Sequence, residues 1–261
     1  MNFLFSLPLG LLAVVLTVSL MGFALVGLWL TRRWVLPPLR LGHEDAYYAA
    51  ALVQSAMLLY GLIAALTAVG VWQRYAEVSD IVSGEATAIA SLWRDLGGYP
   101  PPIRDTSRSI LRGYTRQVID EAWPQQRRGQ VPTGGMEWID RLQEQIFAFE
   151  PATESQKILH AETLTAFNEL VHKRRQRLDA VQGGLPTVLW WVLIPGAVGC
   201  IALCFFFHVE NARFQAILLV GVAGFLAMVL FVIIALDHPA QGDGGITADS
   251  YRLVYDHQMR Q

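Results

Sequence analysis

Four long apolar segments divide the chain, and a long polar stretch separates the second from the third. They lie at about 3–30, 46–72, 185–209 and 214–236. Each has the ~20 residues that a helix needs to cross a ~30 Å hydrocarbon layer. The pattern predicts an all-α membrane protein, with four transmembrane helices arranged as two hairpins that flank a helical extramembrane domain.

The boundaries of these parts follow from the same pattern. We expect a first transmembrane hairpin at 1–72, an extramembrane helical domain at 73–184, a second transmembrane hairpin at 185–238 and a polar tail at 239–261. The tail is too short and too polar to form a domain of its own. The link at 208–211 is short, so we expect the third and fourth spans to be antiparallel neighbours.

The first apolar segment is interpreted as a membrane span rather than a cleaved signal peptide. A signal peptide has a basic start and an apolar core of about 7–15 residues, whereas no Lys or Arg precedes this longer run. Arg32 and Arg33 with Trp34 end the run, as interfacial anchors do. Pro37 and Pro38 then predict a non-helical connection, because proline lacks the N–H that a helix interior needs.

Small side chains recur on one face of the second span, at steps of three and four residues. They are Ala50, Gln54, Met57, Gly61, Ala65 and Ala68. One interpretation is helix packing, in which the small residues allow close approach and Gln54 bonds to a neighbour. The other is that this face lines a pore in an oligomer and leaves room for water or an ion.

Amphipathic helices are predicted in the extramembrane domain. The second span continues past Trp72 with an apolar stripe and stops at Gly97-Gly98. Further helices are expected at 103–123 and 136–149. Thr153 and Gln156 have the spacing of a capping box, which predicts the start of a long helix that runs to about 181.

Arginines gather at two places in this domain. Four lie at four-residue steps on the helix at 103–123, and three belong to a basic cluster just before the third span: Arg104, Arg108, Arg112, Arg116, Arg174, Arg175 and Arg177. One interpretation is a solvated face paired with nearby acids such as Asp105 and Asp120. The other is a surface that contacts an anion, lipid headgroups or a protein partner.

The composition is more apolar and less charged than that of an ordinary soluble protein, so part of the chain is solvated by something other than water. Hydrophobic residues make up 53% and charged residues 16% of the chain. The net charge of -2 provides no basic field for nucleic acid, so we expect none as a partner. Cys200 and Cys204 lie inside an apolar segment at helical spacing, where thiols behave as small hydrophobes.

No chemical motif stands out. None of the histidines has a second His or Cys at metal-ligand spacing; they are His43, His160, His172, His208, His238 and His257. Asp237-His238 is interpreted as the interfacial end of the fourth span. The run Gly242–Gly245 lacks the strand and helix of a phosphate loop. We therefore expect no catalytic residue, no metal site and no cofactor, and do not expect an enzyme.

Several stretches resemble the bestrophin-like domain of uncharacterised bacterial integral membrane proteins. They are Glu85–Trp93, Tyr99–Pro102, Leu111–Tyr114, Val118–Pro124, Arg174–Leu178, Leu185-Pro186 with Trp190-Trp191, and Leu236–Gly242. The likeness runs from about Glu44 onward. Bestrophins are pentameric anion channels with cytoplasmic termini and a helical cytoplasmic body. No acidic calcium-binding cluster or apolar neck can be matched here, so the resemblance does not imply calcium gating.

The resemblance and the span pattern together define two hypotheses. The leading one is a homo-oligomeric pore in the bacterial cytoplasmic membrane, multi-pass in the lipid bilayer, that passes a small anion or solute. The alternative is a non-conducting anchor or sensor whose helical domain docks a protein partner. Charge near the span ends leaves orientation open, because Arg32, Arg33 and Arg40 compete with Arg74 and the basic cluster. The resemblance implies a cytoplasmic helical domain.

Overall fold

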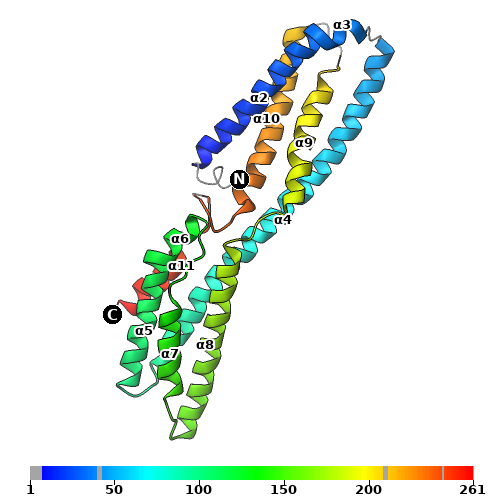
Figure 1. Cartoon of the computed structure of the whole chain (residues 1–261). Helices are drawn as coiled ribbons and strands as arrows, with labels where there is room; N and C mark the ends of the chain where they lie inside the picture. The colour runs from blue at the N-terminus through cyan, green and yellow to red at the C-terminus, as the bar shows by residue number, and fades with distance from the viewer. Residues whose placement is uncertain (1–7, 40–42, 208–210, 243, 261) are drawn as a thin grey trace. The chain divides into compact units, whose positions relative to one another are not determined.

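The computed structural model describes residues 8–39, 43–207, 211–242 and 244–260, and every regular element in these ranges is helical (Figure 1). The chain divides into two compact units. The membrane unit comprises Met1–Gln73 and Gly184–Asp237, and the extramembrane unit comprises Arg74–Gly183 and His238–Gln261. Each unit is described by itself below.

Four helices within the described residues are long and apolar enough to cross a membrane, which confirms the predicted spans. They are α2 (Leu9–Leu30), the first part of α4 (His43–Leu96), α9 (Thr187–Cys204) and α10 (Ala212–Asp237). The predicted start of the first span at 3–7 and most of the 208–211 link lie outside the described residues, as does Arg40.

The connection after α2 stays helical, contrary to the expectation from Pro37 and Pro38. A π-helical turn, η1 (Thr31–Val35), leads into the short helix α3 (Leu36–Leu39) that contains both prolines. Both prolines lie in a helix that continues without a break from α2 through η1, since Leu36 also has right-handed helical backbone angles. The π-helical turn just before them interrupts the regular i→i−4 bonding in which a proline lacks its donor. A non-helical connection is expected only where the regular bonding of a helix interior would continue past them.

Close helix contacts in the membrane unit occur at glycines. Helix α2 packs along α10 (Figure 1), and a Cβ atom added at Gly224 of α10 would lie 2.7 Å from the Met21 side chain. Gly27 of α2 likewise lies directly against the ring of Phe205. At one end of α10 the Asp237 carboxylate accepts a hydrogen bond of 2.6 Å from the Leu185 backbone N–H, beside the start of α9. Asp237 thus has a structural role at the helix end.

The extramembrane unit is a bundle of amphipathic helices. It contains the second part of α4, α5 (Ile103–Gln117), η2 (Val118–Ala122), α6 (Trp123–Arg127), α7 (Met136–Phe147), α8 (Glu154–Ala180), α11 (Asp249–Val254) and η3 (Tyr255–Met259). The continuation of α4 beyond Trp72 agrees with the prediction. The capping box is also confirmed, since Thr153 and Gln156 satisfy each other's backbone N–H groups.

The tail at 239–261, which was expected to form no domain of its own, belongs to the extramembrane unit. Ala248, Tyr251, Val254 and Met259 are buried in the core of the extramembrane unit. Tyr251 is fully buried, and its ring lies 5.6 Å from that of Trp123. These residues place the end of the chain in a core that its polar composition did not indicate.

Candidate functional site

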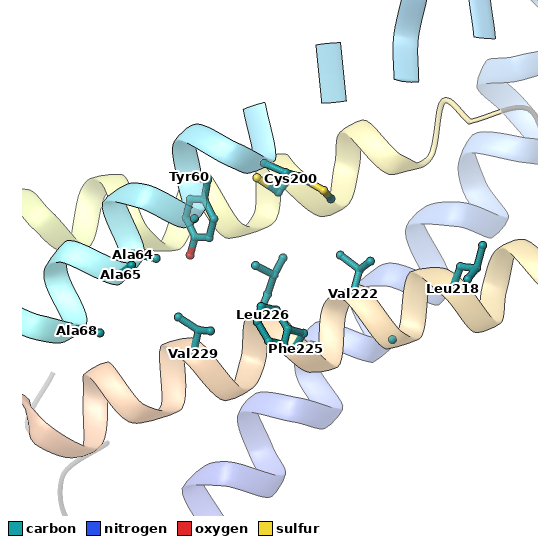
Figure 2. Close-up of a pocket in the computed structure, with 13 residues that line it drawn as sticks. Tyr60, Ala64, Ala65, Ala68, Cys200, Leu218, Val222, Phe225, Leu226 and Val229 are labelled. Atoms are coloured by element: carbon teal, nitrogen blue, oxygen red, sulfur yellow. The ribbon is translucent and has the colours of Figure 1, made fainter. Parts of the chain in front are cut away.

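A groove of about 780 Å³ lies in the membrane unit between α4, α9 and α10. Its lining comprises Met57, Tyr60, Gly61, Ala64, Ala65, Ala68, Cys200, Leu218, Gly221, Val222, Phe225, Leu226 and Val229. Figure 2 shows Val222, Leu226 and Val229 on the α10 side, facing the α4 segment that carries Tyr60. Almost the entire lining is apolar.

The α4 wall of the groove is formed by the small-residue face predicted from the sequence. Met57, Gly61, Ala65 and Ala68 line it. A Cβ atom added at Gly61 would meet nothing within 4 Å, so this wall has free space beside it. Ala50 is half-buried and Gln54 is exposed, and both lie outside the lining.

Tyr60 holds α4 against α9. Its hydroxyl donates a hydrogen bond of 3.2 Å to the Leu193 carbonyl, and its ring covers Gly196 so closely that an added Cβ would lie 2.7 Å from Cδ2. Pro195, next to this contact, cannot donate a backbone hydrogen bond to the preceding turn. Because the Tyr60 hydroxyl is occupied at Leu193, the groove presents mainly apolar and small side chains.

The arginine row on α5 separates into two kinds of contact. Arg108 and Arg112 lie over the Trp93 ring, with their guanidinium carbons 4.8 and 5.4 Å from its centroid. Arg104 and Arg116 form exposed pairs with Asp105 and Asp120. The aspartate beside Arg104 raises the pKa of that guanidinium, and Arg104 lowers the pKa of Asp105.

The arginines of the basic cluster on α8 also lie in different environments. Arg175 is exposed, and Arg174 donates to the Gly134 carbonyl at 3.2 Å. Arg177 is 3% exposed and bonds to Glu85, which is fully buried. The surface role expected for Arg177 therefore does not fit its position, because its guanidinium lies inside the extramembrane unit.

A polar cluster surrounds Glu85 in the core of this unit. Arg177 Nε lies 2.6 Å from Glu85 Oε2, and Arg177 Nη2 lies 3.2 Å from Glu85 Oε1. The hydroxyls of Tyr114 and Tyr251 donate to the same carboxylate at 2.6 and 3.0 Å. One carboxylate therefore connects α4, α5, α8 and α11.

The cluster shifts the proton equilibria of its members. Burial is the largest effect and would lower the pKa of Arg177, but Glu85, with smaller contributions from Tyr251 and Tyr114, holds that pKa above its ordinary value. Burial, followed by the charge of Glu85, raises the pKa of Tyr114 and of Tyr251. The guanidinium therefore stays charged and both phenols stay neutral across the physiological range.

Sequence reasoning missed this cluster, although the register of α4 contained a signal. The buried stripe of α4 is Val78, Val82, Glu85, Ile89, Leu92 and Leu96, at steps of three and four residues. Glu85 occupies a core position in that stripe. Arg177 occupies one in α8, where Phe167 and Leu170 precede it. Opposite charges at core positions of two helices are a pattern that could have indicated a buried pair.

The fold of this chain is similar to that of solved bacterial bestrophin structures. A single-substitution variant of the bacterial bestrophin homologue from Klebsiella pneumoniae is similar with a TM-score of 0.74 and 12% identity, over 95% of this chain and 99% of that chain. A structure of the Klebsiella pneumoniae homologue that was phased with zinc has a TM-score of 0.72 and 13% identity, over 95% of this chain and 98% of that chain. At such identities the likeness shows the fold alone.

Sequence comparison identifies the family directly. No curated protein matches the chain. The family profile described as Bestrophin-like domain, however, matches residues 18–251, nearly the whole chain. The chain belongs to the bestrophin-like domain family.

Proposed function

We propose that the protein is one subunit of a homo-oligomeric membrane pore, and that the small-residue face of α4 lies along the path of the permeating species. The observation that carries the proposal is the open α4 wall of the groove, where Gly61, Ala65 and Ala68 leave space at membrane depth. Family membership supports the same function, because bestrophin homologues share this fold.

We propose a small anion as the permeating species. Some pores select ions with rings of charged side chains, acidic for cations and basic for anions; no charged residue of either sign occurs between residues 46 and 72. An apolar lining at membrane depth suits a hydrophobic constriction, which conducts only when water fills it. Gln54, exposed near one end of the groove-lining face, offers an amide N–H donor to a passing anion.

The proposed location is the bacterial cytoplasmic membrane, with the extramembrane unit in the cytoplasm. Cysteines introduced at exposed positions of that unit, such as Arg175→Cys, are expected to resist labelling by an impermeant maleimide in intact cells. Labelling should appear after the cells are opened. Labelling of intact cells would contradict the proposed orientation.

Conduction is tested with purified protein in planar bilayers. We expect chloride current from the unaltered protein and an oligomer in mild detergent. Gln54→Leu and Gly61→Leu should change the conductance, because one removes the amide and the other fills the open wall. The matched control is Arg252→Gln, an exposed residue of α11, which should leave the current unchanged. A monomeric protein that carries no current would contradict the proposal.

A further inference from the structure

A second pocket, of about 450 Å³, lies within the extramembrane unit where α4, α5 and η3 meet. Its lining residues are Thr87, Ala90, Ser91, Trp93, Arg94, Arg108, His257 and Gln258. Thr87, Ser91 and Arg94 share one face of α4, because they are three and four residues apart. The pocket therefore combines the last turns of α4 with one side chain of α5 and two of η3.

The pocket contains two guanidinium groups that retain free donors. Arg108 uses Nε and Nη2 to donate to the Trp93 carbonyl at 3.3 and 3.1 Å, which leaves Nη1 outside these bonds. Arg94 uses Nε towards Asp95 at 3.2 Å, which leaves both terminal nitrogens outside that pair. Planar guanidinium donors match the oxygens of carboxylates and phosphates.

Neutral groups add to this donor set. His257 donates through Nδ1 to the Leu253 carbonyl at 3.0 Å, so Nε2 of the neutral ring is an acceptor and adds no donor for an anion. Ser91 contributes a hydroxyl and Gln258 an amide. Arg108 is fixed by its bond to the Trp93 carbonyl and by its position over the Trp93 ring, so its guanidinium is held in place before any ligand arrives.

The charge balance favours a negatively charged ligand. No acid is among the lining residues, all of which the structure describes. Of the two acids next to the lining residues in the chain, Asp256 pairs with Arg260 outside the pocket at 3.4 Å. Asp95 pairs with Arg94 of the pocket and offsets part of its charge, so Arg108 carries the charge that neither of these acids pairs with. The C-terminal end of α4 carries partial negative charge, but Arg108 already donates to one of its carbonyls.

We propose that this pocket binds an oxyanion, a carboxylate or a phosphate, and that the bound anion fastens η3 to α4 and α5. The site lies entirely in the extramembrane unit and is independent of whether the membrane unit conducts. A ligand that binds the folded state alone raises its stability as the ligand concentration increases. Binding is therefore read from thermal unfolding as well as from calorimetry.

The experiment titrates the purified full chain, in neutral detergent, with sodium phosphate and separately with sodium acetate. Sodium chloride keeps the ionic strength constant. We expect saturable binding of at least one anion, with a rise in unfolding temperature that chloride does not reproduce. Phosphatidylglycerol added to the micelles offers the same chemistry on a headgroup. Its competition with phosphate would assign the site to a lipid oxyanion, and its failure to compete to a soluble one.

Two variants test the assignment of residues. Arg94 is 77% exposed, so Arg94→Gln should fold normally and weaken anion binding about tenfold through loss of a charge-assisted bond. Gln258→Glu places a negative charge in the pocket and should abolish binding. The matched control, Arg116→Gln, removes an exposed arginine outside the pocket and should leave affinity unchanged. The proposal is overturned if neither anion binds saturably, or if Arg116→Gln weakens binding as much as Arg94→Gln.

Discussion

The two units of this chain are both helical, but their helices are held together by different means. In the membrane unit the close contacts are steric, such as Gly196 beneath Tyr60 and Gly27 against Phe205. In the extramembrane unit an apolar core encloses one carboxylate, one guanidinium and two phenols. The same secondary structure is thus stabilised by shape in one unit and by amphipathic burial with a polar centre in the other.

The solvent of each unit explains the difference. Lipid is as apolar as a leucine side chain, so helices in a membrane gain little by hiding apolar surface and depend on close fit. In water the apolar stripes of α4, α5 and α8 drive association. The buried ion pair is then tolerated because every Glu85 oxygen is hydrogen-bonded. Such pairs contribute little net stability, but removing one partner is costly.

The largest effect is expected at the polar centre of the extramembrane unit. Glu85→Ala should lower the free energy of unfolding by about 3–5 kcal/mol, because it leaves Arg177 buried without its counter-charge. Chemical denaturation followed by tryptophan fluorescence measures the change. The control is Glu77→Ala, which breaks an exposed pair with Arg74 and should cost less than about 1 kcal/mol. Equal losses from the two variants would refute a special role for the centre.

A smaller effect is expected when the close fit between Gly196 and Tyr60 in the membrane unit is disturbed. Gly196→Ala should destabilise the folded protein by about 1–3 kcal/mol, because the new methyl group would overlap the Tyr60 ring. Gly199→Ala, on the same helix, is the control, since its Cβ would meet nothing within 4 Å. Thermal unfolding in detergent compares them. If both variants behave alike, close fit at Gly196 is not what holds α9 to α4.

Tyr251→Phe tests how much one hydroxyl of the centre contributes, and its effect depends on pH. At neutral pH the loss of its bond to Glu85 should cost about 1 kcal/mol. Burial and Glu85 raise the pKa of Tyr251 above its ordinary value of 10.0, so the folded state keeps this proton longer than the unfolded state. The contribution is complete below pH 10 and is lost as pH rises towards the folded-state pKa.

Unfolding midpoints measured from pH 8 to 11 check this dependence. The unaltered protein should lose stability above about pH 10, and Tyr251→Phe should lose it with a shallower slope because one of the two shifted phenols bonded to Glu85 is gone. A steeper slope in the variant would contradict the assignment of the proton to Tyr251.

The smallest effect is expected at the surface of α5. Arg116→Ala should change the free energy of unfolding by no more than about 0.5 kcal/mol, because its pair with Asp120 is solvent-exposed. Arg108→Ala, from the same row, should cost more, since it removes the contact with the Trp93 ring and the bonds to its carbonyl. Equilibrium denaturation of both variants is the measurement. A larger loss from Arg116→Ala than from Arg108→Ala would contradict the distinction between the exposed pair and the contacts with Trp93.

Features that depend on residues close together in the chain could be predicted from the sequence. The four apolar runs gave the spans, and the spacing of Thr153 and Gln156 gave the start of α8. The small-residue face of α4 was also visible, although only the structure shows that Met57, Gly61, Ala65 and Ala68 line a groove with α10. Composition and periodicity do not reveal which helices come together.

The misses share a physical cause. A buried charge and a solvated one look alike in a sequence until a partner is known, and the partner of Arg177 is 92 residues away. A few apolar residues suffice to pack a short helix, so the polar composition of the tail gave no sign of its place in the core. Pro37 and Pro38 were treated as helix breakers without knowledge of the π-helical turn before them.

Glu85 is separated from Tyr251 by 166 residues, and α9 and α10 lie between them in the chain. At ~5–20 residues per second, a ribosome needs on the order of 10 to 30 s to make that interval. During this time the second hairpin is synthesised, while the carboxylate still lacks one of its donors. The water-exposed half of the protein can therefore complete its interior only after the last two spans have emerged, so faults in membrane insertion should also appear as immature folding outside the membrane.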